Sequence, residues 1–600
     1  MMRTSVKNNR KQLLITLIVL VLVNVIGSKI FSRFDLTQDK RYTLSEASHG
    51  IAEQVGNPME IKVLLAGNFK GEFKKLQTET NQILEEYRAI NSNIKFSFVN
   101  PFDEDFSDED KKALIYDIFK IDNPVLSEKD EKEVLASIDQ IKDLNKALDD
   151  SFMGSGFRAA SITVNDKGKQ TQEVVMPWAI VRYKNRSAKI PLLKNMMGAD
   201  IDDNVISSVQ HLEYAFSYAF NAVTKAKQKK IAIIKGNGEL HDALIGDFLK
   251  TVRENYFISP FPLDSIALAP NQGLAFLKKN YDLAIIAKPT TPFSDEQKEV
   301  LDQFVMSGGK TIWLIDQVNM EMDSLYNENG QSLAFPRDLN LNDLFFKYGV
   351  RIHADLVKDI MATPIVLATG EPGSATQYQQ YPWFYSPMVY PASKNPIVSN
   401  LDGIKFEYAS GIELLNNDIK KTVLLQSSPY SKVMGTPLPI DLRMVQERPE
   451  QKDFTGKGNI PLAVLLEGKF RSVYQNRVLP FTDKNYMPVG KANKMIVISD
   501  GDVIRNQLDK NFQPVELGYD QRTGKLYANK EFMMNCVNYL LDDNGLINIR
   551  NKQVSLPVLD KERVAENYTR TQILTVGLPV ALLVVLGVLF TLVRRRIYAR

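Results

Sequence analysis

The chain has 600 residues, a formal net charge of +3, and apolar and charged fractions of 44% and 24% that are ordinary for globular proteins. This length implies several domains, because single hydrophobic cores stop growing near about 250–300 residues. The small net charge argues against a nucleic-acid binder, and one cysteine, Cys536, excludes an internal disulfide. Cys536 lies in an apolar helical pattern, so we expect a buried side chain rather than a nucleophile.

Two apolar segments lie at opposite ends of the chain. Leu13–Phe31 follows basic residues between Arg3 and Lys11, and Ile573–Val593 is followed at once by three arginines. Because basic flanks stay on the cytoplasmic side of a bilayer, both termini are predicted to be cytoplasmic, and about 540 residues to lie on the other face. A cleaved signal peptide is the alternative for the first segment, with a small-residue cleavage site near Gly27. Retention gives a two-pass inner-membrane protein, and cleavage gives a one-pass protein.

The pattern after the first segment predicts a small α/β domain. Thr43 and Glu46 have capping-box spacing, so a helix is expected from here to about Val55. Strand Met59–Leu65, helix Phe73–Ile90 and strand Ile94–Val99 then give a β-α-β order. Further expected elements are a helix starting at Ser107, a charged helix over 130–150, antiparallel strands within 161–183 and a helix with an aromatic face over 212–226.

A second domain is predicted to begin near Lys229. Its apolar strands are expected at 231–234, 281–287, 311–315 and 494–499, with helices between them, including Ser294–Met306. Strands that are apolar on both faces and alternate with helices indicate a parallel sheet covered on both sides. From about Met361 to Val398 the pattern is lost, and the aromatic, proline-rich stretch there predicts a long loop or hairpin.

Nine residues are candidates for a ligand or partner surface: Gly236, Gly238, Glu239, His241, Tyr381, Trp383, Tyr385, Asp500 and Asp502. The first three follow a strand and open a helix, where backbone amides can hold a phosphate, but the three-glycine dinucleotide fingerprint is incomplete and a structural turn is the alternative. Asp500 and Asp502 end a predicted strand, and ligands bind at the carboxyl ends of parallel strands. The aromatic residues can stack on a sugar or a partner, or pack as an ordinary loop.

We expect no catalytic, cofactor-binding or metal-binding residues, and no cofactor. The four histidines are far apart in sequence and have no metal-binding spacing, and His241 has no accompanying Gly-x-Ser-x-Gly motif. The sequence has no Walker motif, so any ATP-driven step requires an ATPase in another chain.

Four stretches carry a resemblance to a known family: "RFDLTQDKRYTLSEAS", "KIAIIKGNGELHDALIGDFL", "YDLAIIAKPTTPFSDEQKEVLDQFVMSGGKTIWLID", and "IVISDGDVIRN" with the later "NKEFMMNCVNYLLDD". Together they resemble the GldG family, the auxiliary subunits of the gliding-motility ABC transporters of Bacteroidetes. The resemblance implies a partner permease, a separate cytoplasmic ATPase, and a role in gliding or linked secretion. The central domain also resembles the class I glutamine amidotransferase-like fold, but it lacks the nucleophile of that family.

The overall expectation is a membrane-anchored multidomain α/β protein with a small α/β domain, a parallel-sheet flavodoxin/amidotransferase-like domain and one transmembrane helix at each end. The expected boundaries are 1–34, 35–228, 229–555 and 556–600. Its expected function is that of a non-catalytic auxiliary subunit that binds a permease through its terminal helices and a periplasmic partner or substrate through its outer domains. Two alternatives stay open: an envelope scaffold that needs no ATP hydrolysis, and a periplasmic hydrolase.

Overall fold

The computed structural model describes residue 13, residues 15–21, residue 35 and residues 43–598. Gaps within the last range are 68, 70, 104, 124–125, 167–168, 195, 226, 267, 370–375, 392, 455–457 and 553–560. The chain divides into two compact units, Met1–Gln553 and Val554–Arg600. Most of the predicted N-terminal span lies outside the described residues, and residues 15–21 within it are helical.

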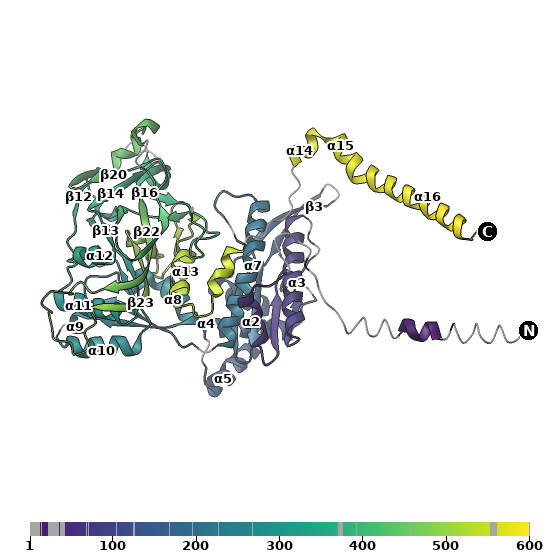
Figure 1. Ribbon diagram of the computed structural model, residues 1–600, viewed down its shortest axis with the longest axis horizontal. Helices are drawn as coiled ribbons and strands as arrows, with labels where there is room; N and C mark the ends of the chain where they lie inside the picture. Colours follow the sequence, from purple (N-terminus) through teal and green to yellow (C-terminus); the bar gives the residue numbers. More distant parts are fainter. Residues whose placement is uncertain are drawn as a thin grey trace, which may run out of the picture. The chain divides into compact units, whose positions relative to one another are not determined.

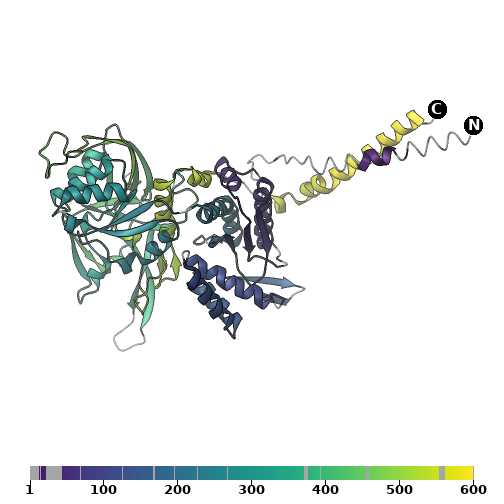
Figure 2. The same cartoon turned by 90° about the horizontal axis from the view of Figure 1, so that it is seen from below.

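A four-stranded sheet with the order β2-β1-β5-β6 organises the first part of the larger unit, drawn in purple to blue in Figures 1 and 2. β1 and β2 are parallel, as the predicted β-α-β order requires, and the pairs β1–β5 and β5–β6 are antiparallel. β3 and β4 form a separate antiparallel hairpin. The strands are β1 (Met59–Val63), β2 (Ile94–Phe98), β3 (Ala160–Asp166), β4 (Lys169–Val175), β5 (Trp178–Tyr183) and β6 (Arg186–Pro191).

Six helices surround this sheet: α2 (Glu46–Glu53), α3 (Glu72–Ile90), α4 (Asp108–Asp122), α5 (Glu128–Asp139), α6 (Leu144–Gly154) and α7 (Ile201–Thr224). The predicted cap at Ser107 is confirmed. The predicted cap at Thr43 is wrong, because Ser45 accepts the hydrogen bond from the first turn of α2. The single helix expected over 130–150 is two helices, because Asp143 caps a second one. α7 starts earlier than expected because Asp200 caps it.

A seven-stranded sheet with the order β19-β22-β23-β10-β9-β7-β8 organises the second part of the larger unit. The five strands from β23 to β8 are parallel, whereas β22 is antiparallel to β23 and β19 is antiparallel to β22. The strands are β7 (Lys230–Lys235), β8 (Phe257–Pro262), β9 (Leu283–Ala287), β10 (Lys310–Leu314), β19 (Lys420–Gln426), β22 (Pro461–Arg471) and β23 (Val489–Ile498). The four strands on which the expected parallel sheet rested, β7, β9, β10 and β23, are parallel, and the complete sheet is mixed because β22 reaches β23 through a loop without a crossover helix, which makes this pair antiparallel.

Helices cover both faces of this sheet, as predicted. Alternate residues of one strand belong to different apolar clusters: Ile233 packs with α8 and α13, and Ile234 packs with α10, α11 and α12. The helices are α8 (Gly246–Asn255), α9 (Leu263–Ile266), α10 (Pro270–Asn280), α11 (Asp295–Met306), α12 (Asn342–Tyr348) and α13 (Asn529–Leu541). Cys536 of α13 is fully buried, as expected, and burial raises the pKa of its thiol well above the ordinary value.

Short strands inserted between β10 and β22 form small sheets beside the main one. They are β11 (Val318–Asn319), β12 (Gln331–Pro336), β13 (Val350–Ile352), β14 (Asp355–Asp359), β15 (Ala362–Thr369), β16 (Gln377–Val389), β17 (Ile404–Lys405), β18 (Ile412–Leu414), β20 (Ser431–Gly435) and β21 (Leu438–Asp441). A last pair, β24 (Tyr519–Asp520) and β25 (Lys525–Leu526), follows β23. The aromatic stretch predicted as a loop or hairpin is the antiparallel hairpin of β15 and β16.

A buried carboxylate on α11 gives the fold a pH-dependent element. Glu299 has no exposed surface; one of its oxygens accepts a hydrogen bond from the Phe481 backbone at 3.1 Å, and the other has no partner among the described residues. Burial is the main reason that the pKa of Glu299 is raised to about 7; the Phe481 amide lowers it in part, and the neighbouring carboxylates of Asp302, Asp483 and Glu296 make smaller contributions that raise it. The folded chain therefore binds this proton more tightly than the unfolded chain does, and stability falls as pH rises from about 4.5 to about 7.

Glu299→Gln is expected to raise the stability at pH 8 by up to about 3.5 kcal/mol, because the pKa rises from 4.5 to about 7 and each unit corresponds to about 1.4 kcal/mol, and to change it little at pH 5. The measurement is the apparent melting temperature of the variant and of the original chain at both pH values. Glu296→Gln, on the more exposed side of the same helix, is the control and should show no such difference. An equal effect of Glu299→Gln at both pH values would contradict the pH-dependent role.

Both ends of the larger unit meet on one buried side chain of α7. The Glu213 carboxylate accepts hydrogen bonds from the Ser45 backbone and the Ser48 hydroxyl, each at 2.7 Å. Its other oxygen lies 2.6 Å from the Lys552 ammonium group, which also donates to the Thr43 carbonyl at 2.8 Å. Glu213 therefore holds residues 43–48, where the continuous description of the unit begins, and its last described residues together.

The smaller unit is helical, with α14 (Lys561–Glu566), α15 (Tyr568–Gln572), a π-helical turn (Ile573–Gly577) and α16 (Leu578–Tyr598), drawn in yellow in Figures 1 and 2. Tyr568–Ile597 is one continuous helical segment, and an 18-residue window within it has a mean hydropathy of 2.8. Among the described residues it alone is long and apolar enough to cross a membrane. The π-helical turn precedes Pro579, where the missing N–H interrupts the ordinary hydrogen-bond ladder.

Candidate functional site

Three adjacent parallel strands of the large sheet bring charged residues together where they end. Lys288 follows β9, Asp316 follows β10, and Asp500 and Asp502 follow β23. This is the sheet edge at which the sequence placed Asp500 and Asp502, and ligands of open α/β sheets bind at such edges.

Lys288 is the centre of this group, which we call the lysine cluster: Lys288, Asp316, Glu321, Asp502 and Arg505. The Lys288 side chain is 2% exposed, and its Nζ lies 2.6 Å from Asp502, 3.0 Å from Glu321 and 3.3 Å from Asp316. Burial alone lowers the pKa of Lys288, but the three carboxylates outweigh burial and raise it above the ordinary value. Lys288 is therefore a fixed positive charge in the interior.

The pKa values of the aspartates of the cluster shift in opposite directions because their neighbours differ. Burial raises the pKa of Asp316 to about 6, although Lys288 lowers it in part. The pKa of Asp502 is lowered, because Lys288 and Arg505 together outweigh its burial. Arg505 also contacts Glu321 at 3.2 Å, so positive and negative side chains alternate through the cluster.

Asp500 and Gly501 support this cluster from the backbone side. Asp500 is fully buried; its carboxylate accepts from the Glu407 amide at 2.6 Å and from the Asp502 amide at 2.7 Å. Burial and the nearby charges of Asp502 and Asp316 raise the pKa of Asp500 well above its usual range. A Cβ atom on Gly501 would lie 2.4 Å from the Lys288 side chain, so glycine is required here for close approach. The Asp-Gly-Asp motif thus orders loops around Lys288.

A pocket of about 540 Å³ lies beside the cluster, and Asp502 and Arg505 form part of its wall. Of the predicted aromatic residues, Trp383 lines this pocket. Tyr385 is 2% exposed and stacks on Tyr408 with ring centroids 6.4 Å apart, so it belongs to the core. Tyr381 is half-buried on β16, bonds to Gln379, and does not line the pocket. The stretch is therefore in part a packed hairpin and in part a pocket wall.

The loop after β7 is a compact turn at the point where the sheet order reverses. Gly236 and Gly238 have φ angles of +115° and +73°, and a Cβ on Gly238 would lie 2.1 Å from the Thr290 hydroxyl oxygen. Glu239 accepts from the Asn237 backbone at 2.8 Å, and His241 accepts from the Ala243 amide at 3.2 Å and caps the 3₁₀ turn Asp242–Ile245. The geometry matches the structural-turn alternative, and none of the four predicted residues lines the pocket beside Trp383.

Sequence reasoning missed Lys288, Asp316, Glu321 and Arg505. Lys288 and Asp316 come directly after the strand ends at 287 and 315 that the sequence predicted, so their position was a usable signal. Their pairing was not predictable, because single charged residues after strands are common on protein surfaces. Within the described residues, no group of three or more His, Cys, Asp or Glu side chains is arranged to hold a metal ion.

Comparison with known proteins places this arrangement in a family. A family model described as ABC-type uncharacterized transport system matches residues 228–536, which is just over half of the chain. The chain belongs to this family of transport-system auxiliary components. The matched region runs from the start of β7 into α13 and so contains the whole lysine cluster. A second family model, described as a domain of unknown function, matches residues 38–182, which include the β-α-β unit.

Two further proteins resemble the chain. An uncharacterized protein of Borreliella burgdorferi is 20% identical over 545 residues, which cover 90% of this chain and 88% of that protein. A solved structure, the mmIFT52 N-terminal domain, is 14% identical and covers 52% of this chain and 98% of its own, with a TM-score of 0.28. A TM-score this low does not support a shared fold or function. The auxiliary components of ABC transport systems are thus the identified family, and the resemblance to the gliding-motility subunits stays a prediction.

Proposed function

We propose that this protein is a non-catalytic, membrane-anchored auxiliary subunit of an ABC transporter, resembling the GldG subunits that serve gliding and linked secretion. Family membership supports the transport role, and Tyr568–Ile597 supports the anchor. Arg594, Arg595 and Arg596 at the end of this helix favour a cytoplasmic C-terminus and an extracytoplasmic location for the larger unit. In this proposal the N-terminal apolar segment is a second span, and both terminal helices bind the permease.

A non-catalytic role is supported by the chemistry of the sheet edge. The charges of the lysine cluster are paired with one another, and paired charges order loops more readily than they transfer protons. Cys536 is fully buried and its thiol pKa is raised, which is unsuited to a nucleophile. His241 uses one ring nitrogen to cap its own turn. An amidotransferase-like or hydrolytic activity would need an activated nucleophile at this edge.

The motor must then lie in other chains, because the sequence has no Walker motif. We propose a permease and a cytoplasmic ATPase as partners in the inner membrane, with the outer domains facing a periplasmic protein or substrate. An envelope scaffold independent of ATP hydrolysis is the second candidate, favoured by the size of the larger unit relative to its anchor.

Purification from native membranes in mild detergent, followed by mass spectrometry, tests the proposal. We expect a permease and an ATPase to co-purify in a stable ratio. The control is a chain truncated after residue 552, which lacks the apolar helix and should lose these partners. A full-length chain that purifies alone would contradict the subunit proposal, and an ATPase-inactive partner that leaves the phenotype intact would favour the scaffold.

A further inference from the structure

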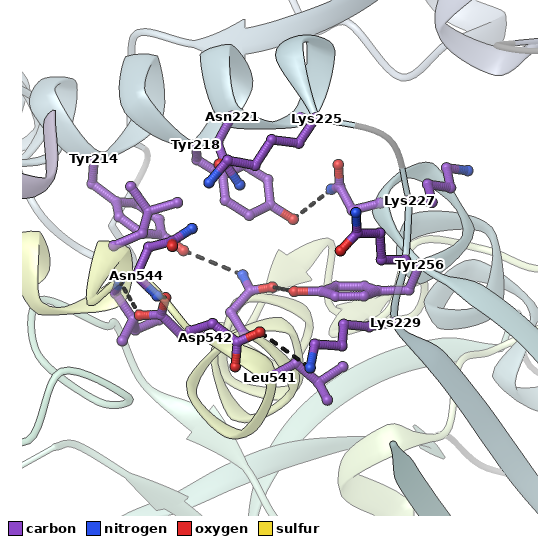
Figure 3. A pocket seen from close by; sticks show the side chains of 17 residues that line it. Tyr214, Tyr218, Asn221, Lys225, Lys227, Lys229, Tyr256, Leu541, Asp542 and Asn544 are labelled. Atoms are coloured by element: carbon purple, nitrogen blue, oxygen red, sulfur yellow. Dashed lines mark hydrogen bonds and ion pairs between the residues drawn. The ribbon is translucent and has the colours of Figure 1, made fainter. Parts of the chain in front are cut away.

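A second pocket, of about 430 Å³, lies within the larger unit where the C-terminal end of α7 meets α8 and α13 (Figure 3). Its walls come from α7, from the connection at 225–229, from the end of α8, and from residues 538–547. The pocket therefore lies between the helices of the first sheet and those of the second. Its volume is in the range of small-molecule sites.

Tyrosine rings form one side of this pocket. Tyr214 and Tyr218 stack with ring centroids 5.7 Å apart and an interplanar angle of 29°. Their hydroxyl oxygens accept hydrogen bonds from Asn538 at 3.2 Å and from Asn255 at 2.5 Å (Figure 3). No described acceptor takes either phenolic hydrogen, so both can donate to a ligand. The Tyr256 hydroxyl differs, because it donates to Asn538 at 2.9 Å.

The pocket wall also carries an excess of positive charge. Lys225, Lys227 and Lys229 line the pocket. Lys229 is paired with Asp543 at 3.1 Å, whereas Lys225 forms no ion pair with any described residue and Lys227 donates to the Arg253 carbonyl. The pKa of Lys227 is lowered, chiefly by burial and further by Arg186 and Arg253, although Glu254 raises it in part. An anion placed here would relieve that repulsion.

The wall holds two aspartates, Asp542 and Asp543, so the three lysines exceed the carboxylates by one charge. Asp542 accepts from the Asn544 amide at 2.9 Å and from the Ile547 amide at 3.0 Å, so its carboxylate is used to order the following turn. In the same wall, the side-chain oxygen of Asn221 is buried and has no hydrogen-bond partner among the described residues. The pocket thus offers unpaired cations, free phenolic donors and an unsatisfied acceptor around apolar ring faces.

We propose that this pocket binds a small organic anion, whose oxygens contact Lys225, Lys227 and the two phenolic hydrogens and whose carbon skeleton lies on the tyrosine rings. The site goes beyond the transport role and does not depend on any partner chain. The walls of the pocket come from helices that pack on the first sheet and from helices that pack on the second. A bound anion would therefore contact both halves of the larger unit.

Titration of the purified full-length protein with phenyl phosphate by calorimetry tests this site. We expect saturable binding to one site. Lys225→Gln should weaken it at least about tenfold, as expected for the loss of a charge-assisted hydrogen bond of about 1.5–3 kcal/mol. Tyr218→Phe, which keeps the ring and removes the donor, should weaken it about three- to tenfold. Lys230→Gln is the matched control, since Lys230 is exposed and outside the pocket.

The absence of saturable binding, or equal binding by the Lys225→Gln variant and the original chain, would overturn the proposal. Benzyl alcohol, which has the ring without the charge, should bind at least tenfold more weakly, and equal affinity would also overturn it. Competition by dihexanoyl phosphatidylglycerol separates two sources of the same chemistry: displacement supports a lipid headgroup, and its absence alongside phenyl phosphate binding supports a soluble anion. Neither result affects the co-purification test.

Discussion

Lys288→Met is expected to destabilise the larger unit by about 3–5 kcal/mol, because it leaves the carboxylates of Asp316, Glu321 and Asp502 without their shared cation in the interior. Methionine keeps most of the volume of the lysine side chain, so the loss is mainly electrostatic. Lys288→Ala should cost more, since the aliphatic stem that packs over Gly501 is also lost. Denaturant unfolding of the variants measures the difference.

The sign of the pH dependence distinguishes an electrostatic cause from simple loss of packing. Without the lysine, the pKa values of Asp316 and Asp502 in the folded chain are higher than they are with it, so the folded chain takes up protons when the pH falls. The loss of stability caused by Lys288→Met should therefore become smaller as the pH is lowered from 7 to 5. A deficit that is constant over this range would contradict the charge argument.

Two variants serve as controls for this result. Lys279→Met, at an exposed position at the end of α10, should change stability by less than about 0.5 kcal/mol. Asp502→Asn combined with Lys288→Met should cost less than the sum of the two single changes, because each removes part of the same interaction. Additive costs would show that Lys288 and Asp502 act independently.

The parts of the fold that follow from local pattern were predictable from the sequence. β7, β9 and β10 are short apolar runs between helical patterns, and the caps at Ser107 and Ser294 are local side-chain signals. β8 was missed because Pro260 and Pro262 interrupt its pattern, which an edge strand tolerates. The antiparallel direction of β22 depends on a loop with no periodicity.

The candidate sites depend on contacts that sequence order conceals. Asp500 and Asp502 were placed at a strand end by a general rule, yet their partner Lys288 is more than two hundred residues earlier. The aromatic face of α7 was expected from the sequence. The pocket beside Tyr214 and Tyr218 was not, because it depends on the position of α13, a helix that packs on the other sheet. Pairing between distant residues is set by packing of the whole unit, and periodicity carries no information about it.

Glu213→Ala is expected to loosen both ends of the larger unit at once. Glu213 is 4% exposed. Its carboxylate accepts hydrogen bonds from Ser45, Ser48 and Lys552, which lie near the two ends of the described part of the unit. Its removal leaves the Lys552 ammonium group without a counter-ion and the Ser45 amide without an acceptor. We expect the free energy of unfolding to fall by about 3 kcal/mol. This is the lower end of the range for breaking a buried ion pair, because the Lys552 side chain is 20% exposed.

Hydrogen exchange read out by mass spectrometry tests whether one residue holds both ends. Peptides covering α2 and peptides covering residues 546–552 should both exchange faster in Glu213→Ala, by a similar factor, since both lose the same anchor. His49→Ala is the control, because the His49–Glu53 pair on the same helix is exposed and should contribute under about 0.5 kcal/mol. Faster exchange in α2 alone would show that the C-terminal end of the unit is held independently. Faster exchange at both ends would show that α2 and residues 546–552 depend on the same side chain of α7.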